Sequence, residues 1–205
     1  MAKIFINRLL LEIEPAMKGN AIKGLAYNKA KEIFDDNKED LLDKFENHIV
    51  SLEIDYGPNG DNISNTLSRG ELFSFIGFRK GTDPLQPIRE ILQNDIQPDK
   101  NVTFDRSIFG YILKVNIPPI KKIYEATPYP DNWNPGSWVR GIETYISGLG
   151  FYLYKQGKKF KSSRSGPAVQ IQYPLRSNQF KRTDYLGKML QQFRAKFRGP
   201  KGRFF

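Results

Sequence analysis

Apolar residues recur at three- and four-residue spacing from Met17 to His48, and Ile49 continues the pattern. They are Ile22, Leu25, Ala26, Ala30, Ile33, Phe34, Leu41, Phe45 and Ile49. This spacing places them on one face of a long amphipathic helix. The first half of the helix is basic and the second half acidic, against the preference of the helix dipole. We therefore expect a break near Asp35–Asn37, with two consecutive helices as the alternative.

Two alternating stretches and two short apolar runs predict four strands. Residues 52–56 alternate and stop at the turn Gly57–Gly60, and residues 102–117 alternate up to a Pro-Pro pair. Residues 151–154 and 168–173 are two further apolar runs. A period of two is typical of a half-buried strand, and the last two runs are expected to pair as a hairpin.

Three shorter helices are indicated by their caps or their periodicity. Thr82 or Asp83 is a candidate N-cap with Pro84 in the first turn, for a helix that ends by Pro98. Ser137 is a candidate cap for a helix that begins at Trp138. The third is amphipathic and carries Tyr185, Leu186, Met189, Leu190, Phe193 and Phe197. Side-chain oxygens at these cap positions accept hydrogen bonds from the free N–H groups of a first turn.

These elements predict an α+β fold in one domain, residues 1–197, followed by a basic tail, residues 198–205. A long N-terminal helix packs on a small, mostly antiparallel sheet, with further short helices. A chain of 205 residues with 39% hydrophobic and 13% aromatic residues is long enough for one sizeable core. No apolar run is long enough to cross a bilayer, and residues 3–13 include Asn7, Arg8 and Glu12, so neither a membrane span nor a signal peptide is expected.

Composition removes most catalytic constellations. The chain has no cysteine and one histidine, His48, so thiol chemistry, zinc centres and Ser/His/Asp triads lack their residues. His48 follows an acidic helix and is interpreted as a cation at that helix's C-terminus. Asp55 and Asp61 flank a turn but lack the dense oxygen ligands of a calcium loop. We expect no enzyme activity, catalytic residue, cofactor, metal or small-molecule substrate.

The positive charge is concentrated in the last quarter of the chain. Residues 155–205 contain 14 lysines and arginines against one acid, a net charge of +13, whereas residues 1–154 have a net charge of −3. Such a block binds nucleic-acid phosphates or an acidic protein surface, or serves only as a solvated face. Three aromatic residues within or beside it, Tyr154, Phe160 and Tyr173, either stack on bases or belong to the core.

Exposed aromatic and basic residues are the candidates for an interface. The loops 57–81 and 127–137 and the C-terminal extension are expected to make contacts between subunits, and Phe75 and Phe78 belong either to an interface or to the core. The tail ends in two aromatic residues and either orders on a neighbour or is disordered. The candidate interface residues are Phe73, Phe75, Phe78, Trp133, Trp138, Lys158, Lys159, Lys161, Arg164, Arg198, Arg203, Phe204 and Phe205.

Five stretches together resemble tail-completion and head-to-tail joining proteins of long-tailed bacteriophages. They are Asn62–Leu67, Gly70–Phe78, Gly81–Pro84 with the helix that follows, Ser137–Glu143 and Ser163–Gly166. The resemblance covers roughly residues 20–190, and no single stretch is specific to the family.

The resemblance implies a virion protein, assembled in the host cytoplasm, whose copies form a ring at the neck or the head-proximal end of the tail. The implied partners are copies of the chain and other neck or tail proteins, with DNA as a further partner of the basic C-terminal third, and no membrane. This chain departs from the family pattern in its basic extension, which leaves neck and tail positions both open. A nucleic-acid-binding protein that uses residues 155–205 is the alternative function.

Overall fold

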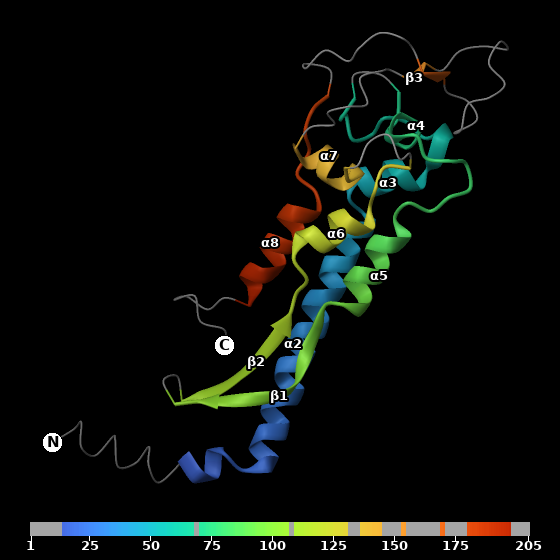
Figure 1. The fold of residues 1–205 in the computed structure, drawn as a ribbon. Helices are drawn as coiled ribbons and strands as arrows, with labels where there is room; N and C mark the ends of the chain where they lie inside the picture. Colours follow the sequence, from blue (N-terminus) through green and yellow to red (C-terminus); the bar gives the residue numbers. More distant parts are fainter. Residues whose placement is uncertain are drawn as a thin grey trace. The chain divides into compact units, whose positions relative to one another are not determined.

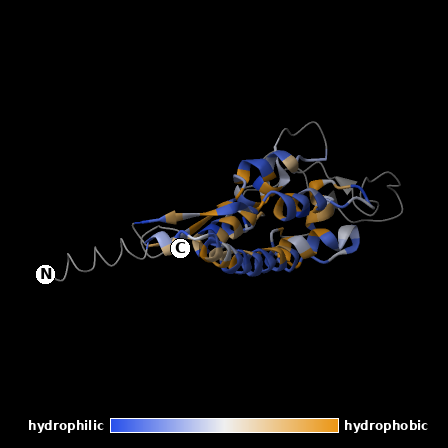
Figure 2. Ribbon diagram, turned by 90° about the horizontal axis from the view of Figure 1, so that it is seen from below, coloured by the Kyte–Doolittle hydropathy of each residue, from blue (hydrophilic) through white to orange (hydrophobic). Residues whose placement is uncertain are grey.

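The computed structural model describes residues 14–67, 70–106, 109–130, 136–144, 153–154, 169–170 and 180–197. It is a mixed α+β fold with a long N-terminal helix, short helices and antiparallel strand pairs (Figure 1). Figure 2 shows hydrophobic residues recurring among hydrophilic ones along the helices. The predicted fold class is therefore confirmed.

The chain divides into two compact units. Unit 1 comprises Met1–Asp40, Ile96–Ile117 and Phe193–Phe205, and unit 2 comprises Leu41–Asp95 and Pro118–Gln192. A division by contacts does not test independent folding, so a single domain over residues 1–197 stays a prediction.

The described part of unit 1 contains most of one long helix, one hairpin and the end of the last described helix. Helix α2, Asn20–Glu46, contributes its residues up to Asp40. Strands β1, Gln97–Asp105, and β2, Gly110–Asn116, pair antiparallel, with Val102 opposite Leu113. Both of these side chains are buried, so the hairpin presents an apolar face.

An aromatic cluster joins α2 to the end of α8, Leu186–Lys196, within unit 1. The ring centroids of Phe34 and Phe193 lie 6.5 Å apart, and those of Phe193 and Phe197 lie 4.9 Å apart. Lys196, the neighbour of Phe197 in the sequence, also forms an ion pair with Asp40 of α2. These contacts fix the last turn of α8 to α2.

Unit 2 contains the remaining helices and one short strand pair. The helices are α3 (Ile49–Asp55), the 3-10 turn η1 (Gly57–Asn59), α4 (Leu72–Ile76), α5 (Gln86–Asn94), α6 (Ile120–Ala126), α7 (Trp138–Thr144) and the first part of α8. Strands β3, Leu153–Tyr154, and β4, Val169–Gln170, pair antiparallel as predicted. The core of this unit includes Phe45, Leu92, Trp138 and Tyr185, each at most 1% exposed.

Two predictions about the first third of the chain are wrong. Helix α2 has no break at Asp35–Asn37, because the dipole acts only on the terminal turns and ion pairs such as Lys31–Asp35 support the middle. Residues 52–55 form the end of helix α3, and Tyr56 is its C-cap, so this stretch is not a strand. There Val50, Glu53 and Ile54 are buried at helical spacing, whereas Tyr56 is 60% exposed.

The alternating stretch 102–117 is correctly predicted as β structure but wrongly as one strand. The chain reverses after Asp105, and β2 begins at Gly110. Phe109 takes a positive φ of 48° in that turn, a conformation with no simple sequence signal. Helix α6 was not predicted, because its only residue buried in the core is Ile123.

Of the two predicted caps, Ser137 is confirmed, whereas Asp83 lies two residues before the N-cap of α5, which is Leu85, and the proline in the first turn is Pro87 and not Pro84. Asp83 Oδ1 accepts hydrogen bonds from the backbone N–H groups of Leu85 (2.9 Å) and Gln86 (3.2 Å) at the start of α5. Ser137 Oγ accepts from the N–H of Arg140 (3.2 Å) at the start of α7. Such contacts depend on a few neighbouring residues, so sequence alone identifies them.

Candidate subunit interface

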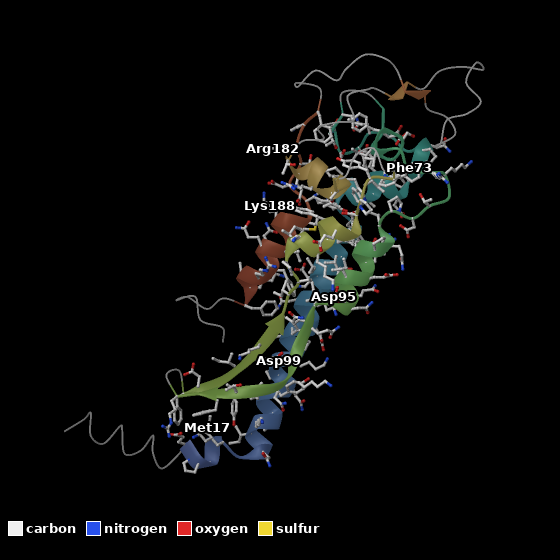
Figure 3. All side chains as sticks on the ribbon, in the orientation of Figure 1. Met17, Phe73, Asp95, Asp99, Arg182 and Lys188 are labelled. Atoms are coloured by element: carbon white, nitrogen blue, oxygen red, sulfur yellow. The ribbon has the colours of Figure 1, made fainter. Side chains whose placement is uncertain are left out.

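Four of the predicted interface rings lie in the core of unit 2. Phe73, Phe75, Phe78 and Trp138 are exposed by only 2%, 4%, 6% and 1%. The Phe78 ring packs against Trp138 with centroids 5.6 Å apart, and Phe73 lies 5.4 Å from Phe78 (Figure 3 labels Phe73). These rings stabilise the fold and present no surface to a partner, so the core assignment replaces the interface assignment.

The other predicted interface residues lie outside the part of the chain that the structure describes. They are Trp133, Lys158, Lys159, Lys161, Arg164, Arg198, Arg203, Phe204 and Phe205. Their roles stay predictions.

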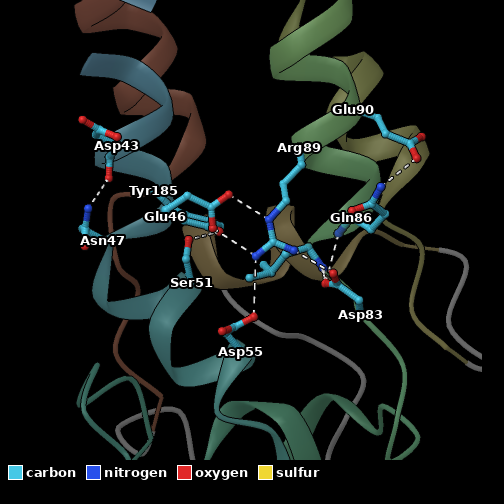
Figure 4. Close-up of polar contacts among 11 residues, drawn as sticks. Asp43, Glu46, Asn47, Ser51, Asp55, Asp83, Gln86, Arg89, Glu90 and Tyr185 are labelled. Carbon is cyan, nitrogen blue, oxygen red and sulfur yellow. Dashed lines mark hydrogen bonds and ion pairs between the residues drawn. The ribbon is translucent and has the colours of Figure 1, made fainter. Parts of the chain in front are cut away.

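The most connected charged cluster of unit 2 surrounds Arg89 on α5 (Figure 4). Its Nε and one Nη donate to the two carboxylate oxygens of Glu46, at 2.8 Å and 3.0 Å. The other Nη donates to Asp83 (2.7 Å). The Nη that bonds Glu46 also lies 3.5 Å from a carboxylate oxygen of Asp55. Glu46 raises the pKa of Arg89 above its ordinary value, so the guanidinium stays charged. This network joins α5 to α3 and to the end of α2. The guanidinium N–H groups of Arg89 bind carboxylates of the same chain.

Two further carboxylates of unit 2 accept hydrogen bonds from the backbone. Glu53 is fully buried and accepts from the N–H groups of Ser64 and Leu72, each at 2.8 Å. Glu143 accepts from the Gly187 N–H and from the Tyr124 hydroxyl, each at 2.6 Å. These carboxylates position loops and helices, which is a structural role.

His48 also has a structural role. Its Nδ1 accepts a hydrogen bond from the Val50 N–H at 3.2 Å and so caps α3, while its ring stacks on Tyr185 at 4.9 Å. Burial lowers the pKa of His48 below 6.5, partly offset by a hydrogen bond with the Asp184 backbone. The earlier interpretation as a cation is therefore wrong, because the neutral ring is favoured. Among the described residues, no cluster of three or more His, Asp or Glu is arranged to hold a metal.

Unit 1 contains an open apolar groove. This groove of about 510 Å³ runs between α2 and the hairpin, and we call it the unit 1 groove. Its lining is almost entirely apolar: Met17, Ile22, Leu25, Ala26, Lys29, Ala30, Ile33, Phe34, Val102, Gly110, Tyr111, Leu113, Val115 and Phe197. Leu25 is 69% exposed and Ile33 is 49% exposed.

Polar contacts hold the walls of the unit 1 groove in place. The Tyr111 hydroxyl donates to the Met17 carbonyl, and Arg106 Nε donates to Glu14 at 2.6 Å (Figure 3 labels Met17). At Lys38, Nζ donates to the Ile96 carbonyl at 2.9 Å. These contacts join α2 and the turn before it to the hairpin, near the hairpin's turn and near its open end. The unit 1 groove lies between the two joined ends.

The unit 1 groove is suited to binding apolar side chains of a polypeptide. Its only charged lining residue is Lys29, whose ammonium already bonds Glu32 at 2.9 Å. The sequence did not indicate the groove, because the three- and four-residue spacing assigned Leu25, Ile33 and the buried Phe34 to one predicted stripe. Periodicity identifies that stripe but does not say which of its residues the hairpin covers.

In the described residues, no helix combines the length and the apolar character that a membrane crossing requires. No protein-family model, curated protein or solved structure matches this chain significantly.

Proposed function

We propose that this chain is a structural subunit of a tailed-bacteriophage particle, in which several copies form a ring at the neck or the head-proximal end of the tail. The observation that carries the proposal is the unit 1 groove with its exposed Leu25 and Ile33. A contiguous apolar surface of this kind is typical of a site that a protein partner covers. Copies of the same chain are the simplest partner, and closed rings are a common result.

The charged side chains of unit 2 also support the proposal of a structural role. The buried Glu53 and the partly buried Arg89 and Glu143 are committed to holding the fold together. Such groups leave this unit with a structural role. The type of particle rests on the sequence resemblance over Gly70–Phe78 and the other stretches described above.

The solution mass of the full chain tests this proposal. Light scattering across a range of protein concentrations, before and after nuclease treatment, is expected to show a monomer that assembles into a closed oligomer. Nuclease is expected to leave that oligomer unchanged. A chain that stays monomeric at every concentration overturns the proposal.

A second candidate function is nucleic-acid binding through the basic block. The observation that favours it is the net charge of +13 over residues 155–205. Binding through many phosphate contacts falls steeply as salt concentration rises. A salt titration with labelled duplex and single-stranded DNA is expected to give a steep negative slope if this function holds. Binding that is absent at low salt removes it.

A further inference from the structure

The unit 1 groove needs an occupant that is long, narrow and apolar. Its α2 wall extends from Ile22 to Phe34, which is about 18 Å at the helical rise of about 1.5 Å per residue. No described segment covers the exposed faces of Leu25 and Ile33. The lining offers few polar partners, so a nucleic acid or a charged small molecule does not match it.

The first residues of the chain have the matching chemistry. Residues 1–13 lie outside the described part, and seven of the ten residues 4–13 are large and apolar: Ile4, Phe5, Ile6, Leu9, Leu10, Leu11 and Ile13. Ile6, Leu9 and Ile13 have the spacing of one helical face. Ten helical residues, 4–13, would span about 15 Å, which is close to the length of the groove wall.

The point of attachment decides which groove this segment fills. Residues 14–17 form a helical turn that leads across the start of α2 and not along it (Figure 1). That turn is fixed by Glu14, which bonds Arg106, and by the Met17 carbonyl, which accepts from Tyr111. To reach its own groove, the chain would have to reverse direction immediately before Glu14. A groove on another copy is reached without that reversal.

We propose that residues 4–13 of one copy bind in the unit 1 groove of a second copy. The inference rests on the proposed function, because it supplies the contact between successive subunits. Donor and acceptor are different surfaces of the same chain, so the contact is head-to-tail. Contacts of this kind generate a ring when the rotation closes.

Two variants that fail for opposite reasons test the proposal. Deletion of residues 2–13 removes the donor and keeps the groove, whereas Leu25→Glu blocks the groove and keeps the donor. Each variant alone is expected to be monomeric by light scattering. Mixed in equal amounts, they are expected to form a complex of two copies that grows no further, because only one contact can form. Ile49→Glu is the matched control, since Ile49 is 43% exposed and lies outside the groove.

Assembly of the deletion variant to the same mass as the full chain overturns this proposal and leaves the proposed function intact. A full chain that never assembles overturns both. A mixture of the two variants that stays monomeric, while each melts like the full chain, also overturns the donor contact.

If a variant fails to fold, a synthetic peptide of residues 1–14 tests the same contact. The peptide is added to the full chain as a competitor for the groove. The peptide is expected to dissociate the oligomer, and a scrambled peptide is expected to have no effect. No dissociation at peptide excess counts against the proposal.

Discussion

Unit 2 and unit 1 bury their apolar residues to different extents. In unit 2 the large rings Phe73, Phe75 and Trp138 are at most 4% exposed. In unit 1 the helix α2 leaves Leu25 and Ile33 largely open beside a groove. Both units contain amphipathic helices, so the difference lies in what packs against them. Unit 2 surrounds its helices with other helices, whereas unit 1 offers α2 one two-stranded hairpin and the end of α8.

The largest effect is expected from truncating a unit 2 ring. Phe75→Ala and Phe78→Ala should each lower the free energy of unfolding by about 3–5 kcal/mol, because a buried Phe loses both its transfer energy and its packing. Denaturant unfolding measures the change. Tyr56→Ala is the control, since Tyr56 is 60% exposed. Unchanged stability of both Phe variants would mean that unit 2 is no better packed than unit 1.

The next effect concerns the buried carboxylate of unit 2. Glu53→Ala removes the acceptor of two backbone N–H groups, from Ser64 and Leu72, and should cost about 2–4 kcal/mol because unpaired buried donors are expensive. Glu53→Gln keeps one acceptor oxygen and should lose less. Chemical denaturation of both variants gives the comparison. Equal losses would show that the charge, and not the acceptor count, stabilises the loop.

A smaller effect is expected from pH through His48. The folded pKa lies below 6.5, so the unfolded chain takes up the proton first as pH falls, and stability should decrease as pH drops below about 6.5. His48→Asn keeps a capping acceptor for Val50 and should remove this part of the pH dependence. Thermal melting from pH 7.5 to 5 measures both proteins. A wild type that gains stability on acidification would contradict the neutral ring.

The smallest effect is expected in the unit 1 groove. Leu25→Ala should change the free energy of unfolding of the monomer by no more than about 0.5 kcal/mol, because 69% of Leu25 is already exposed. Denaturant unfolding at low protein concentration measures it. A loss above about 1 kcal/mol would mean that Leu25 is covered within one copy, which removes the contrast between the units.

Local chemistry predicted much of the fold. Asp83 and Ser137 were identified as side chains that accept hydrogen bonds from N–H groups at or just before a helix start, because such contacts involve only the next few residues. Residues 52–56 were wrongly predicted as a strand because Glu53 is polar and was placed on the solvent side. Its true partners, Ser64 and Leu72, are 11 and 19 residues away, and no local pattern reveals them.

The candidate site was predicted less well than the fold. Aromatic content pointed to Phe73 and Trp138, yet rings are as valuable in a core as at an interface, and these rings are in the core. The groove depends on how far the hairpin β1–β2 covers α2, which is a tertiary property. Leu25 and Phe34 were predicted on one helical face, but nine residues are about two and a half turns, so these side chains leave α2 in opposite directions and have very different exposure.

The contact between Glu143 and Gly187 has a consequence for how this fold diverges in evolution. A Cβ atom at position 187 would lie 3.2 Å from Oε1 of Glu143, whose carboxylate accepts the Gly187 N–H at 2.6 Å. A side chain at 187 therefore requires the Glu143 carboxylate to shift by a few tenths of an ångström or a shorter residue at 143, and loss of the acid removes this reason for glycine. Distant relatives of this chain should show the two positions changing together, a coupled signature that survives after overall sequence similarity has disappeared.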